Sequence, residues 1–351
     1  MYKKRTFGPL LVFVIIIALV VLLVTQTNIL SHTPYFVSGS GEELIQNVIQ
    51  NIQDGNRIIV INRRNTDNFN HLIDRVYDDP ELFWVDMTYN AFSAGQISVL
   101  VLRDKYENID MKQKEIEMVT KNVISTIISD DMSEYDKVLA IHDWLCDNVV
   151  YKATANDSDQ DVYGALVLKE ARCAGYAKAF AYLLEQVGIK SQVVSGESID
   201  RNGTWVAHAW NLVYIDGVPY YFDITWDDYD TDIGYVHSWF GLPSGEFRMS
   251  HFPYGGYYWI ESTRNDACYY IKNNMYVEKY TSSNIAAQIM QQGESFSVKC
   301  ANPNVLADVI DALNDNNELQ KIMRAADIDY IKEITYLQDT HSNCLHIQIV
   351  R

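Results

Sequence analysis

The chain has 351 residues, of which 48% are hydrophobic and 12% are aromatic. This composition can bury a substantial core, which excludes an intrinsically disordered chain. The formal net charge of -18 argues against a nucleic-acid-binding surface, because such a surface needs a basic face. We therefore expect one large or two ordinary globular domains and no nucleic-acid partner.

The N-terminal segment contains an uncharged, mostly apolar run, Phe7–Val24, which is long enough to cross a bilayer as a helix. Three basic residues precede the run, and no Asp, Glu, Lys or Arg follows it before Glu42. By the positive-inside rule, the N-terminus stays in the cytoplasm and the rest of the chain lies outside. Residues 1–30 are thus predicted to be a cytoplasmic tip and an uncleaved transmembrane signal anchor. A cleaved signal peptide is the alternative, but no small-x-small site follows the run.

A linker at residues 31–41 leads to a first α/β segment at residues 42–129. Hydrophobic periodicity in this segment predicts alternating helices and strands. The expected order is a helix, a strand at 57–61, a helix at 68–77, strands at 81–90 and 96–103, and a helix at 112–129. Ser133 then provides the N-cap of a further helix.

The C-terminal segment, residues 261–351, is also predicted to be α/β, with a hairpin at 269–280 and a helical stretch at 303–326. The two flanking segments contain one weak similarity: LIDRVYDDPEL (72–82) and VIDALNDNNEL (309–319) share five of eleven residues. Each follows a strand-like run, which indicates a repeated strand–helix–strand module. Amphipathic helices also resemble one another by chance.

The middle segment, residues 130–260, contains the stretch EARCAGYAKAFAYLLEQVGI, which predicts a helix that begins at Cys173 and ends at Gly188. Helical spacing from Cys173 gives one apolar stripe, formed by Tyr176, Phe180, Leu183, Leu184 and Val187. Unpaired amides and the helix dipole stabilise an anion at a helix N-terminus. The thiol of Cys173 is therefore predicted to have a depressed pKa. An inert core cysteine is the alternative.

Further along, TWVAHAWNLVYIDGVPYYFDITWDD (204–228) predicts a β-hairpin around an Asp216-Gly217 turn. A two-residue loop places His208 opposite Thr225, with His208 and Asp223 on one face and one diagonal step apart. Such a step spans about 7–8 Å between backbones, within side-chain reach. A longer loop would shift the register by one and separate the two side chains. With the shorter loop, the hairpin provides an imidazole that a carboxylate orients.

These three residues have complementary chemical roles. The thiolate of Cys173 would attack a carbonyl carbon. His208 would take the thiol proton or stabilise the thiolate as imidazolium, and then donate a proton to the leaving amine. Asp223 would fix the tautomer and orientation of the imidazole. The backbone amide of Cys173 would stabilise the oxyanion.

The segments GALVLKEARCAGYAKAFAYLLEQVGI and HAWNLVYIDGVPYYFDITWDD, with their spacing, resemble the transglutaminase-like superfamily, in particular its bacterial membrane-anchored or secreted branch. The resemblance implies an α+β fold with a papain-like core at residues 130–260, flanked by mixed α/β segments. It places a catalytic triad on Cys173, His208 and Asp223. It also implies a polar side chain upstream as second oxyanion donor, for which Tyr163 and Gln160 are candidates.

The remaining chemistry-bearing residues have less specific patterns. Trp205, Trp210 and Trp226 are candidates for lining a substrate groove, although aromatic residues more often pack in a core. His142 and Cys146 stand four residues apart on a helix and are expected to form a packed face rather than to share a metal. A solvated loop is likewise favoured over a calcium site for the acidic run of Asp227, Asp228, Asp230 and Asp232.

The five cysteines (146, 173, 268, 300 and 344) form no CxxC pair, which argues against a zinc site or a dense disulfide framework. The sequence contains no Walker loop, no GxGxxG motif after a strand and no HExxH motif. We therefore expect neither a cofactor nor a metal. In an oxidising exterior, an odd number of cysteines leaves at least one thiol free.

The predicted function is that of an extracytoplasmic thiol enzyme that acts on amide bonds through an acyl-enzyme intermediate. Hydrolysis by a cysteine protease or amidase is favoured, because water needs no second binding site. A protein-crosslinking transglutaminase with an amine acceptor is one alternative, and a catalytically silent surface binding protein on the same fold is another. The expected partners are a protein or peptide substrate, including cell-wall peptides, and the membrane through the N-terminal helix.

Overall fold

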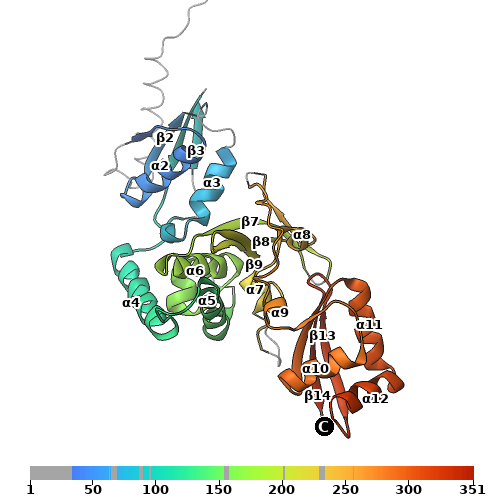
Figure 1. Ribbon diagram of the computed structural model, residues 1–351. Coiled ribbons are helices and arrows are strands. Elements are labelled where there is room, and N and C mark those ends of the chain that lie inside the picture. The colour runs from blue at the N-terminus through green and yellow to red at the C-terminus, as the bar shows by residue number, and fades with distance from the viewer. Residues whose placement is uncertain are drawn as a thin grey trace, which may run out of the picture. The chain divides into compact units, whose positions relative to one another are not determined.

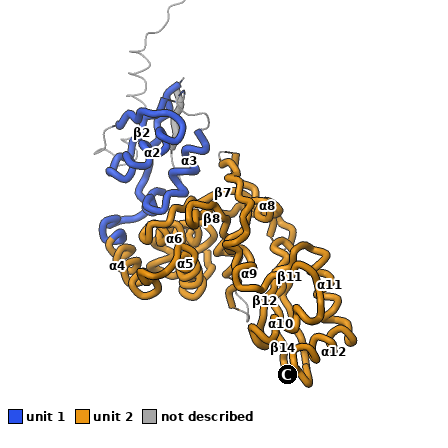
Figure 2. Tube along the Cα trace, in the orientation of Figure 1, with its two compact units in different colours: residues 1–113 blue, residues 114–351 orange. Residues whose placement is uncertain are grey.

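The computed structural model describes residues 34–62, 64, 69–86, 90–94, 96–153, 158–200, 202–228, 234–255 and 257–351 (Figure 1). The predicted anchor at residues 1–30 lies outside the described residues and stays a prediction. Among the helices that are described, none combines the length and the apolar character needed to cross a membrane. The chain divides into two compact units, residues 1–113 and 114–351, and this division falls within one helix (Figure 2).

The first unit contains a four-stranded sheet in the order β1-β2-β4-β3, in which β1 and β2 are parallel and the other pairs are antiparallel. Its elements are β1 (Tyr35–Val37), α2 (Gly41–Gln53), β2 (Ile58–Asn62), α3 (Phe69–Asp78), β3 (Asn90–Ala94) and β4 (Ile97–Val101). The strand expected at 81–90 is wrong over most of its length. Pro80–Leu82 forms a 3-10 turn instead, because the Asp79 carboxylate accepts a hydrogen bond from the Glu81 amide.

The second unit begins with elements that form a mixed α/β core around the antiparallel sheet β10-β7-β8-β9. Helix α6 packs against β7 and β8, so the predicted arrangement of a helix on an antiparallel sheet is confirmed (Figure 1). The elements are α4 (Ile109–Ile127), α5 (Glu134–Asn148), β5 (Val150–Tyr151), β6 (Glu170–Ala171), α6 (Cys173–Gln186), β7 (Ser191–Ile199), β8 (Trp205–Ile215), β9 (Val218–Phe222), α7 (Ile224–Asp227), α8 (Ser244–Phe247), β10 (His251–Pro253) and α9 (Tyr269–Lys272).

A C-terminal α/β module completes the second unit. It consists of β11 (Tyr276–Val277), α10 (Ser282–Gln292), β12 (Ser295–Cys300), α11 (Pro303–Asn314), α12 (Asn316–Ala325), β13 (Glu333–Asp339) and β14 (Cys344–Val350). The predicted hairpin at 269–280 is wrong, because its first half forms the one-turn helix α9 and its second half pairs in parallel with β12. The predicted helical stretch is divided into α11 and α12 where the Asp315 carboxylate caps the second helix.

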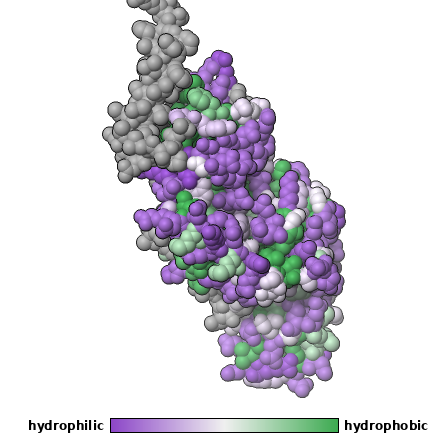
Figure 3. Space-filling view, turned by 90° about the vertical axis from the view of Figure 1, so that its left-hand side faces the viewer, coloured by the Kyte–Doolittle hydropathy of each residue, from purple (hydrophilic) through white to green (hydrophobic). Residues whose placement is uncertain are grey.

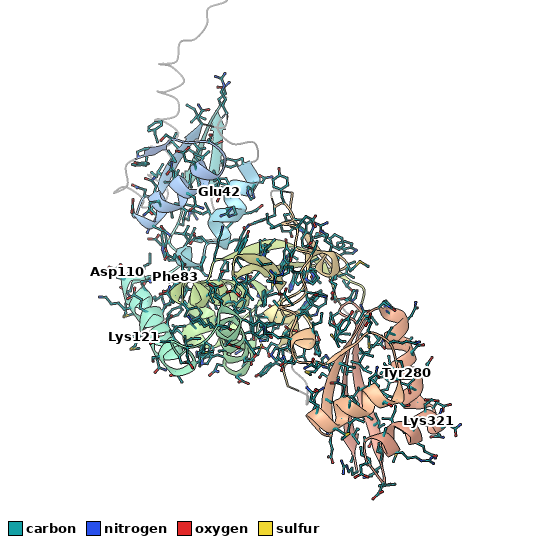
Figure 4. The ribbon with its side chains drawn as sticks, viewed as in Figure 1. Glu42, Phe83, Asp110, Lys121, Tyr280 and Lys321 are labelled. Carbon is teal, nitrogen blue, oxygen red and sulfur yellow. The ribbon has the colours of Figure 1, made fainter. Side chains whose placement is uncertain are left out.

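A polar contact joins the segment just before α10 to helix α12 in this module. The Tyr280 hydroxyl donates to Glu318 at 3.1 Å, and the same carboxylate group pairs with Lys321 at 2.5 Å (Figure 4). Hydrophilic residues cover most of the face of the molecule shown in Figure 3.

The N-terminal unit and the C-terminal module have the same topology. In both, a parallel strand pair is joined by a helix, helical structure follows, and two antiparallel strands complete the sheet in the order β1-β2-β4-β3 or β11-β12-β14-β13. The similar segments 72–82 and 309–319 occupy corresponding places, since each starts in the helix that follows the second strand. The strand–helix–strand repeat that the sequence indicates is therefore confirmed at the level of topology.

Candidate active site

Cys173 is the first residue of α6 and is half-buried. Arg172 before it has an extended backbone, so the helix begins at the cysteine itself. Close packing fixes this position, because a Cβ atom on Gly175 would lie only 2.4 Å from the carbonyl oxygen of Asp159. Gly188, with φ of +76°, follows the end of the helix as the sequence predicts.

The hairpin has the predicted two-residue turn, in which Asp216 and Gly217 both have positive φ and Ile215 pairs with Val218. The ladder ends at Phe222, however, and the chain then forms the one-turn helix α7. Thr225 therefore does not lie opposite His208. The cause is local: the Asp223 carboxylate caps α7 by accepting a hydrogen bond from the Trp226 amide at 3.2 Å.

This arrangement brings the three predicted residues into one connected group. His208 Nε2 lies 2.6 Å from Asp223 Oδ2, and a carboxylate at that distance accepts the ring proton. The Cys173 thiol also forms a hydrogen bond with the His208 side chain. Cysteine, imidazole and carboxylate thus follow one another in a line of hydrogen bonds.

The electrostatics of the group favour a thiolate next to an imidazolium. Burial alone would raise the pKa of Cys173, but the hydrogen bond and charge of His208 outweigh it and lower the pKa of the thiol. Burial would also lower the pKa of His208, whereas the Asp223 charge raises it to about 10. Burial would raise the pKa of Asp223, and His208 instead lowers it to about 2. Each charged form is therefore stabilised by its neighbour.

A second histidine, which the sequence analysis does not single out, also contacts Asp223. His251 Nε2 lies 3.1 Å from Asp223 Oδ2, and the His251 side chain is fully buried. His251 is the first residue of β10, an edge strand that pairs with β7. The two residues are 28 positions apart, and no local pattern in the sequence links them.

Comparison with known proteins finds a family model that matches the segment carrying these residues. Residues 121–238, which include Cys173, His208 and Asp223, match the family model of the transglutaminase-like superfamily. The chain contains a transglutaminase-like domain. Among curated proteins, the kyphoscoliosis peptidases of Homo sapiens and Mus musculus are 26% and 25% identical over 137 and 134 residues, which is 35% and 34% of this chain. In both cases the match covers 20% of the relative, so the chain spans about one fifth of the length of these relatives.

The solved structures that resemble this chain have low sequence identities and low superposition scores. A TGase crystal structure is 18% identical with a TM-score of 0.29, covering 50% of this chain and 52% of that one. A protein of Cytophaga hutchinsonii assigned as a cysteine protease is 15% identical with a TM-score of 0.27, covering 39% and 61%. A protein of Parabacteroides distasonis assigned as a protease is 11% identical with a TM-score of 0.25, covering 47% and 39%.

The three candidate groove tryptophans of the transglutaminase-like domain have different surroundings. Trp226 stacks on the His208 ring at 5.0 Å and shields it on one face. Trp205 is 54% exposed and packs on Phe252. Trp210 is 1% exposed and belongs to the hydrophobic core of the domain, so its prediction as a groove residue is wrong. Its strand position turns it inward, against β10.

The candidates for a second oxyanion donor have other hydrogen-bond partners. The Tyr163 hydroxyl donates to Glu115 at 2.8 Å, and the Gln160 amide donates to Asp159 at 3.0 Å. Their role at the oxyanion stays a prediction. Tyr151, which the sequence analysis does not single out, pairs with Ala171, two residues before Cys173, and is 53% exposed.

At the other end of α7, the transglutaminase-like domain contains a second histidine–aspartate cluster. His142 Nε2 lies 3.2 Å from Asp227 Oδ2, and its Nδ1 lies 2.9 Å from Asp143 Oδ1. His237 Nε2 lies 2.8 Å from the same Asp143 oxygen. Burial would lower the pKa of His142, but the two carboxylates raise it to about 9. The cluster is therefore a buried ion-pair network that holds the end of α7.

Two groups of side chains bring three metal-ligating atoms within 4.8 Å of one another: His142, Asp143 and His237, and His208, Asp223 and His251. In both groups a carboxylate oxygen already accepts hydrogen bonds from imidazoles at 2.6–3.1 Å. These distances are those of hydrogen bonds in which an imidazole N–H donates to a carboxylate oxygen. The expectation that the protein needs no metal stays a prediction. Of the acidic run, Asp230 and Asp232 lie outside the described residues.

Proposed function

We propose that this protein is a cysteine peptidase or amidase that cleaves amide bonds of a peptide through an acyl-enzyme on Cys173. The observation that supports the proposal is the line of hydrogen bonds from the half-buried thiol to His208 and Asp223, with the pKa of the thiol lowered. A thiolate formed in this way is a nucleophile at neutral pH.

The proposed reaction has two steps. The Cys173 thiolate attacks the carbonyl carbon, and the carbonyl oxygen becomes an oxyanion near the Cys173 amide at the start of α6. His208 then donates its Nδ1 proton to the departing amine, which leaves a thioester on Cys173. Water replaces the amine, His208 takes one of its protons, and the tetrahedral intermediate collapses to a carboxylic acid and the free thiolate. Asp223 keeps the imidazole in position throughout.

Hydrolysis is preferred to transfer to an amine for two reasons. The curated relatives that match this domain bear the name peptidase. Water also needs no binding site of its own, whereas an amine acceptor does. Protein crosslinking is the second candidate, because the same thioester serves both reactions.

The experiment is mass spectrometry of a peptide library incubated with the purified full chain, with and without a primary amine. We expect new peptide termini that are absent with Cys173→Ala and present with Cys146→Ala, a matched change of a buried cysteine outside the triad. Incorporation of the amine in place of cleavage would identify a transglutaminase. No reaction of either kind, together with retained peptide binding, would identify a silent binding protein.

The location is part of the same proposal. A helix at residues 7–24 would anchor the chain in the membrane, with the transglutaminase-like domain on the extracytoplasmic side, where proteins and cell-wall peptides are available as substrates. Protease treatment of intact cells tests this arrangement. Digestion of the domain without lysis is expected, and full protection until lysis would contradict it.

A further inference from the structure

The second histidine on Asp223 has a defined proton arrangement. A carboxylate only accepts hydrogen bonds, so His251 Nε2 must carry the proton that it shares with Asp223 Oδ2 at 3.1 Å. The other nitrogen, Nδ1, lies 3.0 Å from the Ser250 hydroxyl. In a neutral ring Nδ1 is an acceptor, and Ser250 donates to it. Burial lowers the pKa of His251 to about 4, which keeps the ring neutral at physiological pH.

Aromatic side chains enclose this imidazole. The rings nearest to His251 have centroids 4.0 to 5.0 Å away and belong to Phe247, Trp226, Trp210 and Trp239. His251, Ser250 and Asp223 are all at most 1% exposed. A ring packed on several sides cannot rotate freely, so its N–H keeps one direction.

The backbone also fixes the distance between His251 and the triad. Gly196 of β7 pairs with His208 on one side and with Pro253, two residues after His251, on the other. A Cβ atom at Gly196 would lie 2.3 Å from the Phe252 carbonyl oxygen, so only glycine permits this close approach. The two histidines are thus held in one register through a single residue of β7.

Asp223 consequently has a donor on each side. Its Oδ2 accepts from His208 at 2.6 Å and from His251 at 3.1 Å, and its Oδ1 accepts from the Trp226 amide at 3.2 Å. Without His251, the carboxylate could rotate about its last bond and the buried charge would lose one donor. Two contacts would then remain: the Trp226 amide on Oδ1, and His208 on Oδ2. His208 is the group that Asp223 is meant to orient, so it cannot by itself fix the carboxylate.

We propose that His251 is a positioning residue of the active site: its neutral N–H fixes Asp223 Oδ2 toward His208 and keeps the carboxylate ionised. The inference rests on the proposed thiol chemistry of Cys173. The titratable groups that face His251 are Asp223 from the β9–α7 junction and His208 from β8, and the Phe247 carbonyl and the Ser250 hydroxyl are its polar neighbours.

The test compares His251→Phe, which removes the donor, with His251→Gln, whose amide nitrogen can replace Nε2. Groups that orient metal-bound histidines contribute roughly 10- to 100-fold to activity. By analogy, we expect a loss of kcat in that range for His251→Phe, with little change in KM. The acidic limb of the pH profile should move to higher pH, because the carboxylate protonates more easily. His251→Gln should retain most of the activity. His346→Gln is the matched control, since His346 of the C-terminal module is equally buried and lies between Ser297 of that module and Ser238 of the transglutaminase-like domain.

A readout that needs no substrate separates this inference from the proposed function. The pH dependence of Cys173 alkylation by iodoacetamide reports the thiolate directly. A shifted alkylation profile in His251→Phe with no peptide cleavage by the parent protein would support positioning and overturn the proposed function. Cleavage by the parent protein, with kcat and both pH profiles unchanged in a folded His251→Phe variant, would overturn positioning alone. If His251→Phe does not fold, a folded His251→Gln variant whose kcat falls tenfold or more would likewise overturn it, because its amide nitrogen keeps a donor for Asp223.

Discussion

The two ends of α7 carry the same kinds of side chain and have opposite chemistry. Asp223 at the start of the helix accepts from two histidines, and Asp227 at its end contacts a third, His142. A cysteine lies near each cluster. His208 lowers the pKa of the Cys173 thiol, whereas burial and the acidic side chains around Cys146 raise its pKa well above the ordinary value.

The difference between the two clusters is the order of the groups. At the first end an imidazole stands between thiol and carboxylate, so the cation is next to the sulfur. At the second end the imidazole of His142 lies between two carboxylates, and burial together with nearby acidic side chains raises the pKa of the Cys146 thiol. Histidine, aspartate and cysteine in proximity are therefore not sufficient for nucleophilic chemistry, because the charge next to the thiol decides whether it ionises.

The largest effect is expected when the first cluster loses its carboxylate. Asp223→Asn keeps the size of the side chain but allows the imidazole the wrong tautomer, and the corresponding change in serine proteases lowers kcat by about 10⁴-fold. We expect a similar loss, measured as kcat on a cleaved peptide, with the circular dichroism spectrum retained. Asp227→Asn serves as the comparison. Equal activity losses in the two variants would show that the ends of α7 do not differ as described.

The second cluster should contribute to stability rather than to rate. His142→Gln removes the cation between Asp143 and Asp227, and the buried Asp227, whose pKa burial already raises to about 7, loses the partner that favours its charged form. Breaking a buried pair in this way costs about 3 kcal/mol of unfolding free energy or somewhat more. Urea unfolding gives the stability, and kcat at low temperature gives the activity of the folded fraction. A loss of kcat as large as in Asp223→Asn, without loss of stability, would contradict this role.

The two thiols offer a direct comparison in one sample. At neutral pH, Cys173 should react with iodoacetamide on the order of 100-fold faster than Cys146, because only the first has a depressed pKa and partial exposure. Peptide mapping of the alkylated protein measures both rates, and 6 M guanidinium should equalise them. Comparable rates in the folded protein would mean that His208 does not activate the thiol.

The sequence predicts the residues of the first cluster because their geometry depends on local signals. A helix start places Cys173, and the Asp216-Gly217 turn fixes the hairpin register that brings His208 near Asp223. The prediction fails at Thr225, since the capping side chain of Asp223 ends the ladder in a way that strand periodicity does not show. His251 and the His142–Asp227 contact, 28 and 85 residues apart from their partners, depend on tertiary packing alone.

The flanking modules show the same limit at the level of the fold. Their shared topology could be inferred from a weak sequence repeat. The contacts that the side chains of each sheet make could not be inferred in this way. In β2 and β4, Ile58, Val60, Val99 and Val101 form one apolar cluster. In the corresponding strands of the C-terminal module, Lys299 and His346 instead bond Glu246 and Ser238, which precede this module in the chain. Alternation along a strand predicts that two faces differ, and the partner of each face depends on the whole structure.

The pH dependence of stability gives a finer comparison of the clusters. The pKa of His142 is raised from 6.5 to about 9, so its contribution is fully present below pH 6.5 and is lost as pH rises through 9. The unfolding free energy should therefore fall between pH 7 and 9.5, by about 1 kcal/mol per pH unit where the fall is steepest. His142→Gln should lack this part of the slope. An identical slope in both proteins, measured by urea unfolding at each pH, would exclude His142 as its source.

The smallest effect is expected at the rim of the second cluster. His237 stacks on Tyr269 at 3.8 Å, and burial lowers its pKa to about 4, so the neutral ring gives Asp143 a hydrogen bond without a charge. His237→Gln keeps a donor and loses only the stacking contact, which should cost about 1 kcal/mol of unfolding free energy. We expect kcat to stay within twofold. A loss of unfolding free energy as large as that of His142→Gln would mean that His237, rather than His142, carries the positive charge. The two imidazoles would then exchange roles in the network that holds α7.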